Sequence, residues 1–209
     1  MKLITTLSSG LLALSLLTGC AEKDNNIENQ TAFFWHNGIY KNITKNNLDK
    51  ADDYFTSLEV EHPNSQYIPT DLVMLSNAHL KNNEYQLAEF YINEYEKRYA
   101  NRYEKEWAEY QKAKIKFFSL SNAYTNQKKL QDTLDFVNKV LVMYPNSIYK
   151  YELNTIKTKL EDTQIVFDNK IANLYKKLDK PKSAKLYQRD TNTDIIPPHI
   201  PWYKRLFYW

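Results

Sequence analysis

The residue types that most often carry out chemistry in proteins are few and scattered in this sequence. The histidines are not spaced with each other or with cysteine as metal ligands are, and three glycines are too few for a fold built on phosphate-binding loops. Neighbouring acids, such as Asp52 with Asp53 and Glu59 with Glu61, are typical of solvated helical charges. We predict no catalytic residue, no metal and no cofactor. We expect each histidine at the surface or in a groove: His36, His62, His79 and His199.

The only cysteine, Cys20, has the clearest chemical role. It follows an apolar run that is too short to cross a bilayer comfortably and is typical of a signal peptide. The letters LTGC at its end resemble the lipobox of bacterial lipoproteins, whose cysteine receives an S-diacylglycerol and an N-palmitoyl chain. We therefore predict a lipoprotein signal peptide at residues 1–19 and a lipidated, flexible tether at residues 20–32.

Lipidation at Cys20 predicts where the protein is found. Two or three acyl chains would form a stable anchor, because each buried methylene contributes about 0.8 kcal/mol. The next residue, Ala21, differs from the aspartate that retains many lipoproteins in the inner membrane. We expect a protein anchored in the outer membrane of a Gram-negative bacterium and facing the periplasm.

The composition indicates a helical protein that does not bind nucleic acid. Leu, Lys, Glu, Ala and Gln are abundant and glycine is rare, which favours helices. The formal net charge is only +3 and opposite charges are interspersed, whereas nucleic-acid binding needs a concentrated basic face. The seventeen tyrosines suit helix packing and binding grooves alike.

Two short patterns repeat along the chain and mark helix boundaries. The triplet KNN begins at Lys45 and again at Lys81, and Pro-Asn-Ser-x-Tyr follows His62 and again Tyr144. Proline disfavours helix at the preceding residue, and Asn or Ser can cap the next helix. The spacing is near the ~34 residues of a tetratricopeptide repeat. We predict two helical pairs, at residues 33–44 with 48–61 and at residues 68–80 with 84–99.

Two further pairs are less regular. We predict helices at residues 104–123, 129–144 and 148–163, and we leave open whether residues 148–178 form one helix or two. A small residue is expected where the two helices of each pair cross closely; the candidates are Ala51, Ala88, Thr133 and Ala184. The predicted fold is an all-α, tetratricopeptide-like solenoid of about four helix-turn-helix repeats over residues 33–189.

Residues 190–209 form a tail rich in proline and aromatic residues that departs from the repeat pattern. Its prolines prevent a continuous helix up to residue 201. The aromatic residues beyond that point suit three roles: a cap on the open end of the solenoid, a grip on a partner protein, or contact with the membrane interface. The sequence leaves these alternatives open.

The order of these features resembles the BamD (ComL) family of outer-membrane assembly lipoproteins. The resemblance covers nearly the whole chain and rests on LTGC, on the first hairpin and its joint, on YPNSIY and on KIANLYKKLDKPKSAKLY. It implies a non-catalytic scaffold of the β-barrel assembly (BAM) complex, which helps to insert barrel proteins into the outer membrane. The implied partners are the POTRA domains of BamA, other BAM lipoproteins and unfolded outer-membrane β-barrel proteins.

The resemblance also implies two sites. One is a substrate groove along the first helices of the N-terminal repeats, with the candidate residues His36, Tyr40, His62, Val73, Asn77 and Lys81. The other is a docking surface for partners in the C-terminal part, with the candidates Arg189, Trp202, Tyr203, Lys204, Arg205, Phe207 and Trp209. The alternative hypothesis is another periplasmic tetratricopeptide lipoprotein, such as one that coordinates cell-wall synthesis with envelope division.

Overall fold

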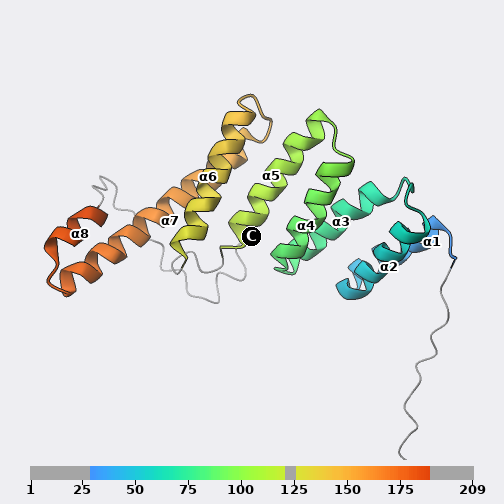
Figure 1. Ribbon diagram of the computed structural model, residues 1–209, viewed down its shortest axis with the longest axis horizontal. Coiled ribbons are helices and arrows are strands. Elements are labelled where there is room, and N and C mark those ends of the chain that lie inside the picture. Colours follow the sequence, from blue (N-terminus) through green and yellow to red (C-terminus); the bar gives the residue numbers. More distant parts are fainter. Residues whose placement is uncertain (1–28, 121–125, 189–209) are drawn as a thin grey trace, which may run out of the picture.

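The computed structural model describes residues 29–120 and 126–188, and each regular element in these ranges is an α-helix. The helices are α1 (Ala32–Thr44), α2 (Leu48–Glu61), α3 (Ile68–Lys81), α4 (Tyr85–Arg98), α5 (Arg102–Phe118), α6 (Gln127–Met143), α7 (Lys150–Lys177) and α8 (Pro181–Tyr187). They form an elongated array with α1 and α2 at one end and α8 at the other (Figure 1). Cys20 and the predicted docking residues from Arg189 onward lie outside the described residues.

Consecutive helices pack as pairs, α1 with α2, α3 with α4, α5 with α6 and α7 with α8, which confirms the predicted all-α solenoid. The first helices also touch across the repeats, α1 against α3 and α5 against α7. The open question about residues 148–178 is answered by α7, a single helix of 28 residues. The helix expected at residues 104–123 ends earlier, at Phe118, where the Ser119 hydroxyl donates to the carbonyl of Lys116 at 2.7 Å.

A residue in the left-handed backbone conformation precedes the small crossing residue of three pairs by the same distance along the chain. The left-handed residues are Asn46, Asn83 and Asp179, with φ of 56°, 63° and 54°. The buried crossing residues that follow them are Ala51, Ala88 and Ala184. Asn and Asp adopt this conformation more readily than most L residues. The two KNN triplets therefore differ in backbone conformation. The left-handed residue is the second residue of the first triplet, Asn46, and the third residue of the second triplet, Asn83.

The two Pro-Asn-Ser joints have the same hydrogen bonds. In the first, the Ser65 backbone N–H donates to the His62 carbonyl at 2.9 Å, and the Ser65 hydroxyl accepts from the Tyr67 N–H at 3.2 Å. In the second, Ser147 bonds to the Tyr144 carbonyl at 3.1 Å and accepts from the Tyr149 N–H at 3.0 Å. The serine in both copies thus closes the turn before the next first helix.

The apolar interior has two parts that meet at α5. The N-terminal core lies among α1 to α5 and includes Trp35, Phe55 and Leu72, while the second core lies among α5, α6 and α7. Helix α5 supplies Ile115 to the first core and Ala113 to the second. Since each pair covers the apolar face of the next, the array is held together by contacts between neighbours.

Candidate functional site

Five of the six predicted groove residues lie on α1 and α3, the first helices of the first two pairs. His36 and Tyr40 are about one turn apart on α1, and Val73, Asn77 and Lys81 follow one another at similar intervals on α3. Tyr40, Asn77 and Lys81 are exposed, whereas Val73 is half-buried against the N-terminal core. Because α1 packs against α3, the structure places these two rows on neighbouring helices.

His36 links the two helices through a buried acid. Its Nδ1 lies 2.7 Å from Oδ1 of Asp71 on α3, and its ring stacks on Tyr67 with 4.5 Å between centroids. Asp71 is fully buried, and its other oxygen, Oδ2, has no hydrogen-bond partner among the described residues. Burial raises the pKa of Asp71 to about 6, although the hydrogen bond from His36 and its charge act in the opposite direction.

The sixth predicted groove residue, His62, lies on neither α1 nor α3. It caps the end of α2, and its Nε2 is 2.7 Å from the carbonyl oxygen of Gln30. The neighbouring Glu61 accepts hydrogen bonds from the backbone of Gln30 and from Trp35 Nε1. His62 and Glu61 therefore fix the segment that enters α1.

The expectation that His79 lies at the surface or in a groove is wrong, because its side chain is 1% exposed. Its Nε2 lies 3.0 Å from Oδ1 of Asp52 on α2, and its Nδ1 bonds to Glu84 at the start of α4. The Tyr91 hydroxyl donates to the same Asp52 oxygen at 2.7 Å. Asp52, expected to be a solvated charge, is instead the acceptor that joins α2, α3 and α4.

The contacts with Asp52 and Glu84 shift the pKa values in this cluster. Burial disfavours the charged imidazole, but the hydrogen bonds that the ring makes to Asp52 and Glu84, together with the charges of these acids, outweigh burial and raise the pKa of His79. Burial, together with Asp52, raises the pKa of Tyr91. Both ring nitrogens of His79 are engaged and the ring is covered, which leaves it no reach to a substrate. The cluster therefore clamps three helices together.

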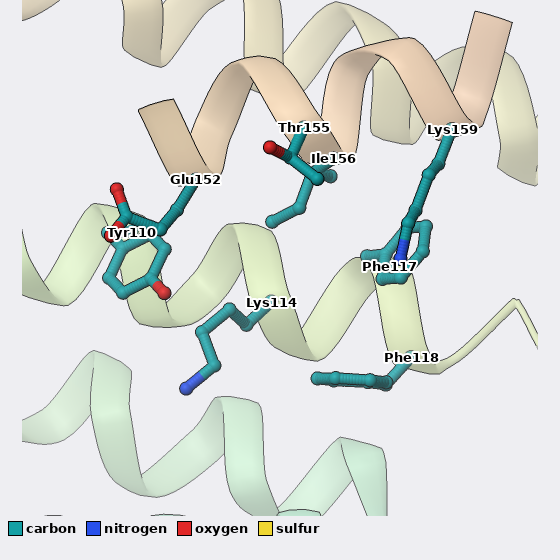
Figure 2. A pocket seen from close by; sticks show the side chains of 8 residues that line it. All are labelled: Tyr110, Lys114, Phe117, Phe118, Glu152, Thr155, Ile156 and Lys159. Atoms are coloured by element: carbon teal, nitrogen blue, oxygen red, sulfur yellow. The ribbon is translucent and has the colours of Figure 1, made fainter. Parts of the chain in front are cut away.

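A hollow between α5 and α7 was not predicted from the sequence. It has a volume of about 220 Å³ and lies between the first helices of the third and fourth pairs. The residues that line it are Tyr110, Lys114, Phe117, Phe118, Glu152, Thr155, Ile156 and Lys159. On α5 they lie at positions i, i+4, i+7 and i+8, and on α7 at i, i+3, i+4 and i+7, so the sequence does place each set on one face of its helix. In Figure 2, Tyr110 lies beside Glu152 and Phe117 beside Lys159 in the space between α5 and α7, whereas Lys114 and Phe118 lie on the other side of α5 in this view.

The charges of this hollow sit beside aromatic rings. Lys114 Nζ lies 5.5 Å from the centre of the Tyr110 ring, and Lys159 Nζ lies 5.8 Å from that of Phe117. Burial lowers the pKa of Lys114 and raises that of Tyr110, and the charge of Glu152 adds to the shift of Tyr110. Tyr110 also stacks on Tyr149 at 4.6 Å, which fixes the ring at one end of the hollow.

A second, more polar hollow of about 320 Å³ lies among α4, α5 and α6. Its cations are already engaged, because Lys116 Nζ lies 2.6 Å from Oε1 of Glu89 and Lys129 Nζ bonds to the Ser119 carbonyl at 2.8 Å. In the described ranges, no group of three or more His, Cys, Asp or Glu side chains could hold a metal ion. Nor does any described helix have the length and apolar character needed to span a membrane.

Comparison with known proteins identifies the family. The family model of the outer membrane lipoprotein YfiO matches residues 28–185. The chain belongs to the YfiO family. Its curated relatives include the outer membrane protein assembly factor BamD of Helicobacter pylori, which is 33% identical over 200 residues, 92% of this chain and 91% of that protein. The BamD of Caulobacter vibrioides is 26% identical over 149 residues, 69% of this chain and 48% of that protein.

Among the described residues, the matched segment covers α1 to α7 and the larger part of α8. The resemblance to the BamD family is thereby confirmed. Both helices of the predicted groove and both helices of the hollow fall inside the match.

Proposed function

We propose that this protein is a non-catalytic scaffold lipoprotein of the BAM complex that assists the assembly of β-barrel proteins in the outer membrane. The observation that carries this proposal is the match along 92% of this chain and 91% of a relative named as an outer membrane protein assembly factor. The array of helix pairs supports a scaffold role, because such arrays offer long binding surfaces.

Lipidation of Cys20 anchors the protein in the outer membrane, with the helical array in the periplasm. The LTGC motif supports this part of the proposal. Mass spectrometry of the protein from membranes should find the N-terminal peptide beginning at an acylated Cys20. A Cys20→Ser variant should lose that modification and leave the outer-membrane fraction. An unmodified Cys20 in the membrane-bound protein would contradict the lipid anchor.

The partners in this proposal are BamA, through its POTRA domains, and the other BAM lipoproteins. The C-terminal part docks them, with Arg189 and the aromatic tail as candidate contacts. Affinity purification of the tagged protein from its own bacterium, after gentle cross-linking, should recover BamA, and depletion should lower barrel proteins in the outer membrane. Recovery of peptidoglycan enzymes without BamA would favour the cell-wall alternative.

The groove on α1 and α3 receives segments of unfolded barrel proteins. The exposed Tyr40 and Asn77 on neighbouring first helices support this assignment. A photo-reactive residue at Tyr40 or Asn77 should cross-link to newly exported barrel proteins. The matched control is Val60, which is 76% exposed on α2, a second helix. Equal yields of cross-links from Val60 and Tyr40 would contradict a groove at this place.

A further inference from the structure

His36 has one ring nitrogen bound to α3 and the other open to solvent. Its Nδ1 lies 2.7 Å from Oδ1 of Asp71, and its side chain is 21% exposed. Among the described residues, His36 Nε2 has no hydrogen-bond partner. A buried Nε2 would be an unpaired buried atom, and in the described ranges Oδ2 of Asp71 is the only side-chain atom of that kind. The exposed part of the ring therefore includes Nε2.

Asp71 determines which nitrogen of His36 carries the proton. Burial raises the pKa of Asp71 to about 6, so its carboxylate is mostly ionised near neutral pH. An ionised carboxylate only accepts hydrogen bonds, and Nδ1 must therefore be the nitrogen that donates. In the uncharged imidazole the other nitrogen, Nε2, then has a lone pair and accepts. The groove thus presents a hydrogen-bond acceptor that is held in place by a buried acid.

The acceptor lies between two exposed aromatic side chains. Phe33, His36 and Tyr40 are at positions i, i+3 and i+7 on one face of α1. Phe33 and Tyr40 are each 57% exposed, and the ring of Tyr67 contacts both Phe33 and His36. The row is about 10 Å long at about 1.5 Å per residue. An extended chain covers this length in about three residues, so a segment that lies along α1 passes Nε2 between the two rings.

We propose that Asp71 positions His36 so that Nε2 accepts a hydrogen bond from a main-chain N–H of the segment that binds along α1. The proposal rests on the groove proposed above and specifies one contact within it. An unfolded segment carries a main-chain N–H at every residue except proline, so this contact recognises extended backbone rather than a particular side chain. A folded strand has these N–H groups paired, and His36 therefore selects segments that are still unfolded.

One more proton on the pair reverses this contact. If the proton binds the imidazole, Nε2 becomes a donor. If it binds Oδ1 of Asp71, the carboxyl donates to Nδ1 and the proton of the ring moves to Nε2, which again donates. A proton on Oδ2 would have no acceptor among the described residues. The site therefore loses its acceptor as the pH falls, whichever group takes the proton.

Other titratable and charged groups lie on the elements around the pair: Tyr67 before α3, Glu61 of α2, Glu84 of α4 and the exposed Lys41 and Lys81 of the groove helices. Tyr67 stacks on the His36 ring. The two acids are bonded within the array, Glu61 to Trp35 and Glu84 to His79. Among the described charges, that of His36 is the one that shifts the pKa of Asp71.

NMR spectroscopy tests the position of the proton in the parent protein. Long-range proton–nitrogen correlation spectra distinguish a protonated ring nitrogen from one with a lone pair. Near neutral pH we expect His36 to carry its proton on Nδ1. His62 is the control in the same spectrum, because its Nε2 lies 2.7 Å from the Gln30 carbonyl, which can only accept. A proton on Nε2 of His36 near neutral pH would overturn the proposal.

A double variant removes the acceptor without leaving a buried charge. His36→Phe keeps a ring beside Tyr67, and Asp71→Leu, made with it, replaces the acid that would lose its partner. Exchanging both partners of a buried hydrogen bond for apolar groups can be nearly neutral for stability. Circular dichroism establishes that the double variant is folded, and the signals missing from its spectrum assign those of His36.

Backbone methylation of a bound peptide tests the contact itself. The probe is a synthetic peptide copied from one membrane strand of an outer-membrane barrel protein of the same bacterium, with a methyl group on one main-chain nitrogen at a time. Near neutral pH, we expect methylation of at least one nitrogen to weaken binding about two- to tenfold more for the parent than for the double variant. Fluorescence anisotropy measures the affinities. In the parent protein this extra loss should disappear below about pH 5, which is a readout that needs no variant.

Two failures of this experiment have different meanings. If the peptide binds and methylation weakens binding equally in the parent and the double variant, His36 has no such contact and the groove remains. If the unmethylated peptide does not bind the parent protein, the groove itself is contradicted, and the His36 contact with it.

Discussion

Gly38 on α1 faces the ring of Tyr54 on α2 so closely that a Cβ atom placed on it would lie 2.0 Å from Cδ1 of that ring. Alanine normally stabilises a helix interior relative to glycine by about 1 kcal/mol. Here we expect Gly38→Ala to destabilise the protein instead, by roughly 1–3 kcal/mol, because the ring must move within a packed pair of helices. Urea denaturation followed by circular dichroism measures the change.

A double variant isolates the cause. If the clash with the ring is responsible, Gly38→Ala should cost little in a Tyr54→Ser background, where the ring is absent. The two substitutions then have a large coupling free energy. Additive effects would mean that the backbone of α1, rather than Tyr54, requires glycine at this position.

The left-handed turn residue Asn46 offers a second prediction. Asn46→Gly should leave the stability nearly unchanged, because glycine adopts positive φ without steric cost. Asn46→Val should destabilise the protein by about 1–2 kcal/mol, since a branched side chain strains this conformation. The neighbouring Lys45 has a φ of −89°, so Lys45→Val serves as the control and should have little effect. Thermal unfolding midpoints compare the three variants.

The helix pairs could be predicted because their signals are local. Periodicity, the KNN triplets and the Pro-Asn-Ser joints each lie within one pair or one turn. The continuity of α7 was also within reach, since neither proline nor glycine occurs between Lys150 and Lys177. Small residues predicted at the crossings, such as Ala51 and Ala88, are indeed fully buried.

The side-chain clusters could not be predicted because their members are far apart in sequence. The sequence does not distinguish Asp52 from its neighbour Asp53. Only the packing of α3 against α2 brings His79 into contact with Asp52. Likewise, the partner of His36 is Asp71, 35 positions away. The hollow combines α5 with α7 across the whole of α6, so neither helix alone reveals it.

The contrast between Asp52 and Asp53 yields a matched pair of variants. Asp52→Ala removes the carboxylate that Tyr91 and His79 bond to. The buried Tyr91 hydroxyl and His79 Nε2 then lose this hydrogen-bond partner. We expect a loss of roughly 2–4 kcal/mol in the free energy of unfolding. Asp53→Ala changes an exposed carboxylate and should stay within about 0.5 kcal/mol of the parent. Equal effects in urea titrations at neutral pH would contradict a clamp at Asp52.

The buried Asp71 predicts how stability depends on pH. Its pKa is about 6 in the folded protein and 3.8 in the unfolded chain, so the folded state binds this proton more tightly. The stabilisation from this proton is fully present below about pH 4 and is lost as the pH rises through 6. Asp71→Asn removes the titration, while its amide oxygen can still face His36.

We therefore expect the stability of Asp71→Asn, relative to the parent, to rise between pH 4 and pH 7, by up to about 3 kcal/mol for a shift of this size. Urea titrations of both proteins across this range measure the difference, which cancels the contributions of other groups. Asp49→Asn, at an exposed position in the first turn of α2, is the control for adding an amide. A relative stability that stays constant from pH 4 to pH 7 would show that Asp71 keeps the same proton affinity in both states.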